Sequence, residues 1–305
     1  MSIISDEFYN QPPSALSVSD ALLKIRNACP AVRVFTAGKS LLSRPITAAA
    51  VGNVRQNNSV LFAAGFHGQE WLTSFIMIRF LDDIARHINS AKGFFGLNVK
   101  EALQQSGLVV VPLVNPDGVE IAVNGVKTAG VYADNAEKML EKYGGKWQAN
   151  AAGIDINHNF NAGFAKLKKI EREMGIDSPR PGKYGGERAH SEPETRAIVK
   201  LCGSFWFKRA FAFHSQGEEI YYSYGDNTPA QSLLLCRLFC ALCGYTPAVA
   251  NGSAAHGGFK DYFINFYHRP AFTVEIGKGE NPLPTEDFDS IYSRLREMLL
   301  TAVII

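Results

Sequence analysis

Hydrophobic and polar residues form two kinds of segment along this chain: short apolar runs, and longer stretches with apolar residues at helical spacing. Apolar runs typical of buried or extended strands lie at residues 32–37, 46–51, 59–64, 107–114, 207–214 and 272–276. Helical spacing predicts helices at residues 17–28, 71–89, 165–174, 192–201, 230–243 and 285–301. Strands and helices alternate along the chain, which predicts a single α/β domain with a mostly parallel sheet and helices on both faces.

Two of these helices carry signals for their first residues. Ser19 or Asp20 is expected to cap the first helix. The fourth is expected to start at Ser191, with Pro193 in its first turn and Glu194 as the acid of a capping box.

No linker, repeat or low-complexity segment divides the chain. Residues 1–30 are interpreted as an N-terminal extension with a helix, and residues 31–305 as the main domain. The sequence Asn-Pro-Asp-Gly at 115–118 predicts a turn that stops a strand. Residues 161–190 are charged and rich in Gly and Pro, which predicts a surface loop around one short helix.

Composition excludes several classes of protein. The chain has 305 residues, 46% of them hydrophobic, and a net charge of +2 from 31 basic and 29 acidic residues. No basic run points to nucleic acid, and no apolar stretch reaches the roughly 18 residues of a membrane helix. The segment at 1–13 lacks the basic and apolar regions of a secretory signal, which favours a cytoplasmic location.

The five cysteines are odd in number and lack paired spacing, which argues against a disulfide framework and fits a reducing compartment. Cys236, Cys240 and Cys243 share one helical face, and a soft-metal site there is one interpretation. The apolar residues around them favour another, in which the thiols pack as small apolar side chains.

Candidate chemistry lies at the ends of three predicted strands. His67 and Glu70 follow the strand that ends at residue 64. His214 ends a second strand, and Glu275 lies near the end of a third. Ligands of open α/β sheets bind beyond the carboxyl ends of the strands. Two imidazoles and one carboxylate make a three-ligand zinc site with one position open for water, on which Glu275 can act.

Each signal has a simpler interpretation when taken alone. An isolated His-x-x-Glu sequence is more often a capped helix with a chance histidine, and a single strand-end histidine is more often structural. Convergence of three segments at one edge of a sheet favours the metal site instead. The other histidines without such a context are interpreted as surface or packing residues: His87, His190, His256 and His268.

On these residues the chain resembles the zinc carboxypeptidase A-like metallopeptidases. His67-Gly-Gln-Glu70 matches the first ligand motif of that family. His214 matches its second ligand histidine, and Glu275 in Phe-Thr-Val-Glu-Ile-Gly matches its catalytic glutamate.

Two further segments, at 115–118 and 153–160, are similar to the family's Asn-Pro-Asp-Gly and Gly-Val-Asp-Leu-Asn-Arg-Asn-Phe sequences. The resemblance implies a mixed, mostly parallel eight-stranded sheet flanked by helices, with one zinc ion as cofactor. It also implies hydrolysis of an amide bond near the C-terminal end of a peptide, which makes residues 31–305 the expected zinc peptidase catalytic domain.

A narrower resemblance is to bacterial γ-D-glutamyl-diaminopimelate peptidases, which cut the γ-D-glutamyl–diaminopimelate bond of cell-wall peptides. The similar segments lie at residues 186–188, 191–194, 214–221, 257–262 and 277–284. A muropeptide is therefore the expected substrate, with no nucleic acid or membrane partner. Two alternatives remain: a general metallocarboxypeptidase that releases C-terminal L-amino acids, and a non-catalytic peptide-binding module.

The chain departs from these relatives at two positions. His158 follows Asn157 where digestive carboxypeptidases have arginine, so the bidentate guanidinium for a substrate carboxylate is absent. Gln148 replaces an arginine with which bacterial relatives often stabilise the oxyanion. Either the substrate is recognised elsewhere or another cation binds its carboxylate; the candidates are Lys260, Arg269 and Lys278.

The remaining roles are expected as follows. Glu275 accepts the proton of the zinc-bound water and delivers it to the leaving amine. Asp155 orients a ligand histidine through its ring N–H, or is a solvated turn residue. Asn157 holds a carboxylate or the scissile peptide, or bonds its own backbone in a turn.

Two further expectations concern the substrate. Tyr262 or a neighbouring tyrosine forms a mobile lid over it. The adjacent acids Glu218 and Glu219 either pair with the diaminopimelate amine or are solvated. The competing tyrosines are Tyr221, Tyr222, Tyr224 and Tyr267.

Overall fold

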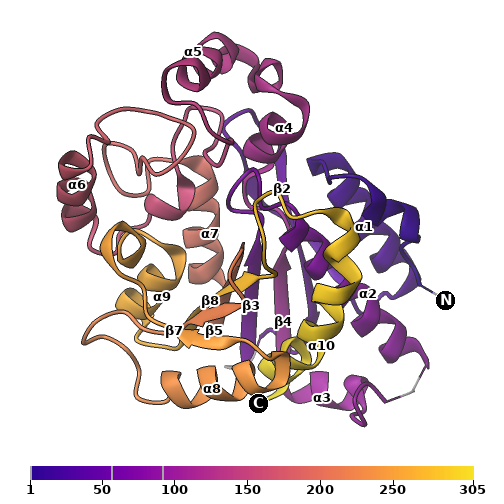
Figure 1. Cartoon of the computed structure of the whole chain (residues 1–305). Coiled ribbons are helices and arrows are strands. Elements are labelled where there is room, and N and C mark those ends of the chain that lie inside the picture. Colours follow the sequence, from indigo (N-terminus) through magenta and orange to yellow (C-terminus); the bar gives the residue numbers. More distant parts are fainter. Residues whose placement is uncertain (1, 56–57, 91–92) are drawn as a thin grey trace.

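The structure is a computed structural model that describes residues 2–55, 58–90 and 93–305 (Figure 1). An eight-stranded mixed sheet with the order β1-β2-β4-β3-β5-β8-β6-β7 crosses the molecule. The strands are β1 (Arg33–Lys39), β2 (Pro45–Gly52), β3 (Ser59–Ala64), β4 (Gly107–Val111), β5 (Phe207–Ser215), β6 (Glu219–Tyr221), β7 (Thr246–Ala248) and β8 (Ala271–Ile276). The predicted fold class is confirmed.

The four central strands, β4, β3, β5 and β8, run parallel. The hairpin of β1 and β2 joins β4 in the antiparallel sense on one side, and β6 joins β8 in the same sense on the other. The carboxyl ends of β3, β5 and β8 therefore lie at one edge of the sheet. The register pairs His214 of β5 with Glu275 of β8, so these two side chains are neighbours on the same face.

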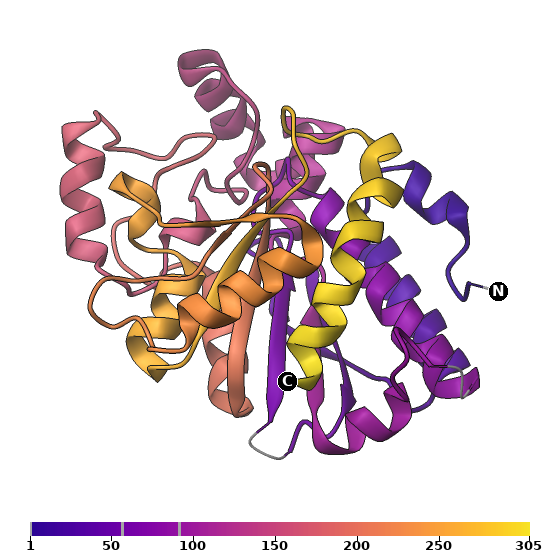
Figure 2. The same ribbon diagram turned by 60° about the horizontal axis from the view of Figure 1, so that its bottom comes forward.

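Helices cover both faces of the sheet (Figures 1 and 2). One face packs against α1 (Ala15–Ala28), α2 (Leu72–Ser90), α3 (Val99–Gln105), α8 (Ser232–Cys243) and α10 (Phe288–Ile304). The other packs against α7 (Pro193–Ser204) and α9 (Phe259–Tyr267). The remaining helices are α4 (Pro116–Asn124), α5 (Ala133–Tyr143) and α6 (Phe164–Glu173), and the 3₁₀ turns are η1 (Asp6–Asn10), η2 (Val126–Tyr132), η3 (Ile156–His158), η4 (Gly252–Ala255) and η5 (Thr285–Asp287).

Alternate residues of the central strands enter two separate hydrophobic cores, because successive side chains of a strand point to opposite faces. Phe62, Phe211 and Phe272 belong to the core under α1, α2, α8 and α10, with Phe62 and Phe211 packed edge to face at 5.1 Å. Ala63 and Ala212 belong to the core under α7 and α9. The small residues on this second face let α9 lie close to the sheet, and this is the face to which His214 and Glu275 belong.

The six predicted helices are present with shifted ends, as α1, α2, α6, α7, α8 and α10. The short elements α3, α4, α5, α9, β6 and β7 were not predicted. α5 packs Ala136, Met139 and Leu140 against Trp147 in a small cluster outside the two main cores.

Both predicted helix caps are wrong. Ser14 caps α1 in a reciprocal pair with Ser17, each hydroxyl accepting the other's backbone N–H at 3.0 and 2.8 Å. Ser19 lies inside that helix. At α7 the residue before the helix is Glu192, with no side-chain cap, and the buried Glu194 accepts the backbone N–H of Leu41 at 2.9 Å. The Glu194 carboxylate is thus bonded to the turn between β1 and β2, and not to the backbone at the start of its own helix.

The Asn-Pro-Asp-Gly segment begins a helix as well as ending a strand. Asn115 caps α4 by accepting the backbone N–H of Gly118 at 2.9 Å, and Pro116 takes the first helical position.

The helix of the predicted N-terminal extension shares the main core. Leu22 and Ile25 of α1 are fully buried in the same cluster as Phe62. The five cysteines are free and buried, and Cys236, Cys240 and Cys243 lie in that cluster too, as the packing interpretation expects. None of the described helices has the length and apolar character needed to cross a bilayer.

Candidate metal and catalytic site

The loop from β3 to α2 carries the first two candidate ligands. A Cβ on Gly68 would lie 2.2 Å from the carbonyl oxygen of Gly118, so only glycine allows this loop to touch the start of α4. The side-chain amide of Asn115 donates to the carbonyl oxygen of Phe66 at 2.9 Å. The Asn-Pro-Asp-Gly segment therefore supports the loop that presents His67 and Glu70.

His67, Glu70 and His214 come together at the carboxyl ends of the central strands. Nδ1 of His67 lies 2.8 Å from one oxygen of the Glu70 carboxylate, and Nδ1 of His214 lies 2.8 Å from the other. The three ligand atoms lie within 4.8 Å of one another, and no other set of three potential ligands does so in the described part of the chain. Two imidazole nitrogens and a carboxylate around one point suit zinc.

Asp155 contacts the second ring nitrogen of His67. Its carboxylate lies 3.1 Å from Nε2 of His67 and accepts the backbone N–H groups of Asn157 and Lys183 at 3.1 and 3.0 Å. Burial opposes its ionisation, but His67, His158 and the Lys183 N–H outweigh burial and hold the pKa of Asp155 well below its usual range. A proton on Nε2 of His67 would leave the Nδ1 lone pair for a metal ion, and the geometry is compatible with the orienting role predicted for Asp155.

Charge is distributed unevenly over the two glutamates. Burial opposes ionisation of Glu70, yet His67 and His214 lower its pKa to about 2. Burial raises the pKa of Glu275 well above its usual value, and repulsion from Glu70 adds to the effect. A dication among the ligands favours ionised carboxylates, so it lowers the pKa of Glu70 further and opposes the rise at Glu275. Glu70 is thus suited to bind metal and Glu275 to exchange a proton.

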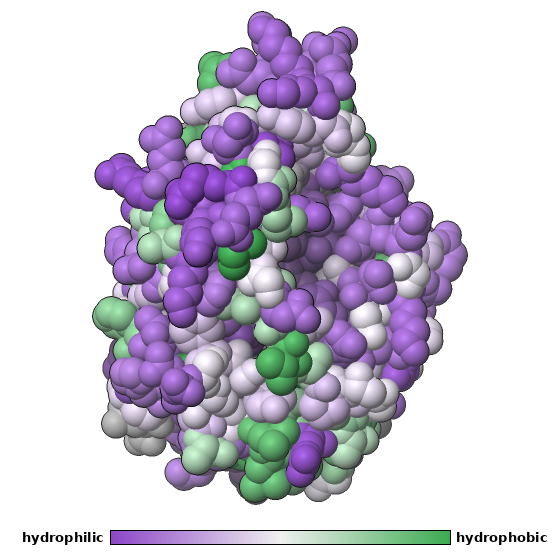
Figure 3. All heavy atoms as spheres, turned by 60° about the vertical axis from the view of Figure 1, so that its left-hand side comes forward, coloured by the Kyte–Doolittle hydropathy of each residue, from purple (hydrophilic) through white to green (hydrophobic). Residues whose placement is uncertain are grey.

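A cavity of about 190 Å³ connects these groups with the candidate substrate residues. Asn157, His158 and Lys260 line it together with the three ligands and Glu275, so these residues bring five separate segments of the chain together. Figure 3 shows the side of the molecule that carries α6 and α9, where the surface is mainly hydrophilic and hollowed near its centre.

Of the three candidate cations, only Lys260 lines this cavity. Arg269 lies at the opposite end of β5, where its guanidinium stacks on Trp206 at 3.6 Å. Lys278 is exposed and pairs with Glu218 at 3.1 Å. Glu218 also pairs with Arg294, which removes it as a partner for a substrate amine.

Two predicted substrate contacts lie outside the cavity. Gln148 lines a neighbouring cavity of about 400 Å³ together with Gln69 and Gln216. The structure does not support the expected contact of Tyr262: its side chain is 4% exposed and packs against Phe160 in the core under α9.

Tyr221 lines the metal cavity instead, with its hydroxyl donating to Glu219 at 2.8 Å. Asp261 also lines it and was not singled out. Its position directly after Lys260, in a segment with two glycines, was the available signal.

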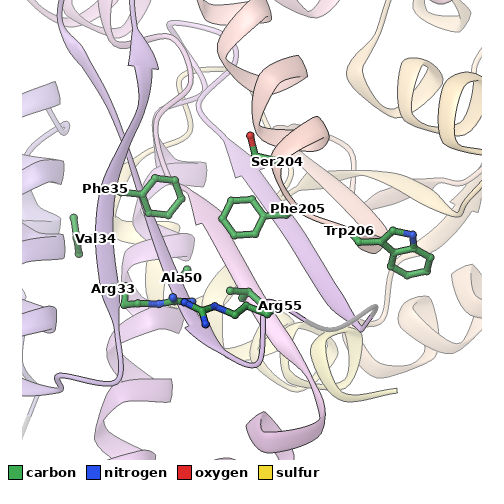
Figure 4. A pocket seen from close by; sticks show the side chains of 9 residues that line it. Arg33, Val34, Phe35, Ala50, Arg55, Ser204, Phe205 and Trp206 are labelled. Atoms are coloured by element: carbon green, nitrogen blue, oxygen red, sulfur yellow. The ribbon is translucent and has the colours of Figure 1, made fainter.

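A larger cavity, of about 560 Å³, lies away from these groups (Figure 4). Arg33, Arg55 and Trp206 line it, and the rings of Phe35 and Phe205 lie 6.0 Å apart beside it. No acid, histidine or cysteine is among its lining residues, so it offers neither metal ligands nor an acid–base pair.

The site beside Glu275 therefore has the composition of a metallohydrolase centre: three zinc-type ligands, a carboxylate hydrogen-bonded to one of them, and a second carboxylate with a raised pKa. On an α/β sheet of this kind, it defines a zinc-dependent peptidase.

The chain belongs to the zinc carboxypeptidase family, whose model matches residues 18–236. It is 33% identical over 283 residues to the γ-D-glutamyl-L-diamino acid endopeptidase 1 of Lysinibacillus sphaericus, an alignment that covers 92% of this chain and 69% of the relative.

Among solved structures, thrombin-activatable fibrinolysis inhibitor superimposes with a TM-score of 0.77 at 18% identity, covering 100% of this chain and 77% of that one. The murein-tripeptide amidase MpaA of Escherichia coli O157 gives a TM-score of 0.55 at 18% identity, covering 87% and 91%. These two likenesses concern the fold.

Proposed function

We propose that this zinc peptidase hydrolyses the γ-D-glutamyl–diaminopimelate amide bond of cell-wall peptides. One observation carries the proposal: the cavity that holds the zinc ligands contains the buried Lys260, whereas His158 replaces the arginine that ordinary C-terminal recognition uses. The similarity to a γ-D-glutamyl-L-diamino acid endopeptidase supports the same substrate class.

The metal would be held by Nδ1 of His67, the Glu70 carboxylate and Nδ1 of His214. When bound, zinc supplies a water whose pKa falls toward about 7 and a Lewis acid for the scissile carbonyl. Glu275 accepts a proton on its carboxylate and returns it to the leaving amine. Asp155 keeps the proton of His67 on Nε2 throughout.

Asn157 and His158 are proposed to receive the α-carboxylate of diaminopimelate. The side-chain oxygen of Asn157 accepts the backbone N–H of Phe259 at 3.0 Å, which leaves its amide N–H groups for substrate. Nδ1 of His158 donates to the carbonyl oxygen of Lys183 at 3.0 Å, so Nε2 is the ring atom left for substrate, and a contact with a carboxylate requires a second proton there. Gln148, in the neighbouring cavity, would contact the acyl side of the bond.

We also propose that the substrate is a free muropeptide met in the cytoplasm. The five free, buried thiols support a reducing compartment. The near-neutral net charge of +2 supports a small peptide as partner in preference to a polyanion.

The test is a product analysis with the zinc-loaded enzyme. L-Ala-γ-D-Glu-meso-diaminopimelate and a hippuryl-type dipeptide are incubated separately, and products are identified by mass spectrometry. Release of diaminopimelate and L-Ala-D-Glu is expected. Cleavage of the hippuryl peptide alone would identify a general metallocarboxypeptidase. Tight binding of the tripeptide to zinc-loaded protein without any cleavage would identify a binding module.

A further inference from the structure

Lys260 and Asp261 form an ion pair inside the metal cavity. Both residues line it, and they are only 4% and 1% exposed. The ammonium of Lys260 donates to the Asp261 carboxylate and to the carbonyl oxygen of Ser223. Buried charges at the wall of a substrate cavity are costly unless their partners are complete.

The hydrogen bonds of this pair are incomplete. An ammonium group has three N–H donors. Among the residues that the structure describes, Lys260 gives one to Ser223, at 2.6 Å, and one to Asp261. One donor therefore remains for a ligand in the cavity, and a carboxylate with two oxygens retains acceptor capacity as well.

The pair is held in place by the start of α9. A Cβ on Gly258 would lie 3.0 Å from Oδ2 of Asp261, and one on Gly257 would lie 2.7 Å from the carbonyl oxygen of His158. The two glycines thus let α9 begin directly against the segment with Asn157 and His158. The ion pair and the proposed α-carboxylate site consequently share one wall.

We propose that Lys260 and Asp261 together bind the zwitterionic end of the diaminopimelate side chain, Lys260 receiving its carboxylate and Asp261 its ammonium. This inference rests on the proposed function and deepens it. The L-centre of meso-diaminopimelate supplies the scissile nitrogen and the α-carboxylate, so the distal D-centre carries one free amine and one free carboxylate.

Charge balance explains why a paired acid and base suit this ligand. Without ligand the pair has no net charge, and a bound zwitterion adds none. Each charge of the pair can then lie next to the opposite charge of the ligand. A lysine side chain would bring an unmatched ammonium, and an acidic side chain an unmatched carboxylate. Each would leave one buried charge without a partner, which discriminates strongly against it.

The experiment compares three substrates that differ only at the distal end: L-Ala-γ-D-Glu joined to meso-diaminopimelate, to L-lysine, or to L-2-aminopimelate. The first carries both charges, the second only the amine and the third only the carboxylate. We expect the wild-type enzyme to favour the first over each of the others by about tenfold to a hundredfold in kcat/KM. This comparison needs no variant, so a misfolded variant does not leave the inference untested.

Variants then assign the two contacts. Lys260→Met should lower kcat/KM for the diaminopimelate and aminopimelate substrates and spare the lysine substrate. Asp261→Asn should lower it for the diaminopimelate and lysine substrates and spare the aminopimelate substrate. Lys278→Gln, a lysine outside the cavity, is the matched control and should keep the wild-type order.

Equal cleavage of all three substrates by the wild-type enzyme, or an equal loss for all three in both variants, would overturn the inference and leave the pair as a structural link between α9 and Ser223. Either result would still leave γ-D-glutamyl hydrolysis standing. Absence of any γ-D-glutamyl cleavage, with hippuryl hydrolysis retained, would instead reject the proposed function.

Discussion

The buried carboxyl group of Glu194 should make the stability of the folded protein depend on pH. Its carboxylate is fully buried at the first turn of α7, where it accepts the backbone N–H of Leu41. Burial raises its pKa from 4.5 to about 7, and repulsion from Asp117 and Glu192 contributes to this shift. The folded protein therefore binds a proton at Glu194 more tightly than the unfolded chain does.

The sign and size of the effect follow from this difference. Between pH 4.5 and about 7 the unfolded chain releases the proton and the folded protein retains it, so the free energy of unfolding falls as pH rises. A pKa change from 4.5 to about 7 corresponds to about 3 kcal/mol at most, most of which falls between pH 5 and pH 8. Glutamine at this position cannot ionise and can still accept the Leu41 N–H.

Urea unfolding of the wild-type protein and of Glu194→Gln, followed by circular dichroism at pH 5 and pH 8, measures this contribution. The variant should gain about 2 to 3 kcal/mol relative to the wild type on going from pH 5 to pH 8. Glu280→Gln changes a carboxylate that is 94% exposed and should gain nothing. If the wild type and Glu194→Gln showed the same pH dependence, the assignment of a neutral, buried acid at this position would be wrong.

Three predictions concern the catalytic site. Glu275→Gln should lower kcat by about a hundredfold to ten-thousandfold while zinc, measured by atomic absorption, stays at the wild-type level; a near-normal rate would remove Glu275 from the proton transfer. Asp155→Asn should weaken zinc affinity by about tenfold to a hundredfold in competition with a chelator dye, and unchanged affinity would show that Asp155 does not orient His67. Chelation should abolish hydrolysis and zinc should restore it; activity that persists in metal-free protein would contradict the ligand set.

The central strands and their helices could be predicted because buried strands and helices need apolar residues in runs or at helical spacing. The same reasoning brought His67, Glu70, His214 and Glu275 together, since carboxyl ends of neighbouring parallel strands must share an edge. The resemblance to a known family added the eight-stranded count and the order of the motifs.

Other features depend on contacts that no local pattern contains. Glu194 forms no capping box because its carboxylate accepts the backbone N–H of Leu41, 153 positions away. Tyr262 turns toward the core because it lies in α9, a short helix that was not predicted, and so Lys260 and Asp261 face the cavity while Tyr262 does not. Side-chain direction changes with each residue of a helix, so the direction of the Tyr262 side chain could not be predicted without α9.

The pairing of His214 with Glu275 places one predicted ligand and the predicted general base on adjacent inner strands. Their spacing is a property of the backbone ladder, and local loosening of the surrounding loops leaves it intact. A one-residue slip of β8 would send Glu275 to the opposite face. Separation of His214 from Glu275 should therefore require cooperative unfolding of the central sheet. The backbone amides of these two residues should be among the slowest to exchange with deuterium.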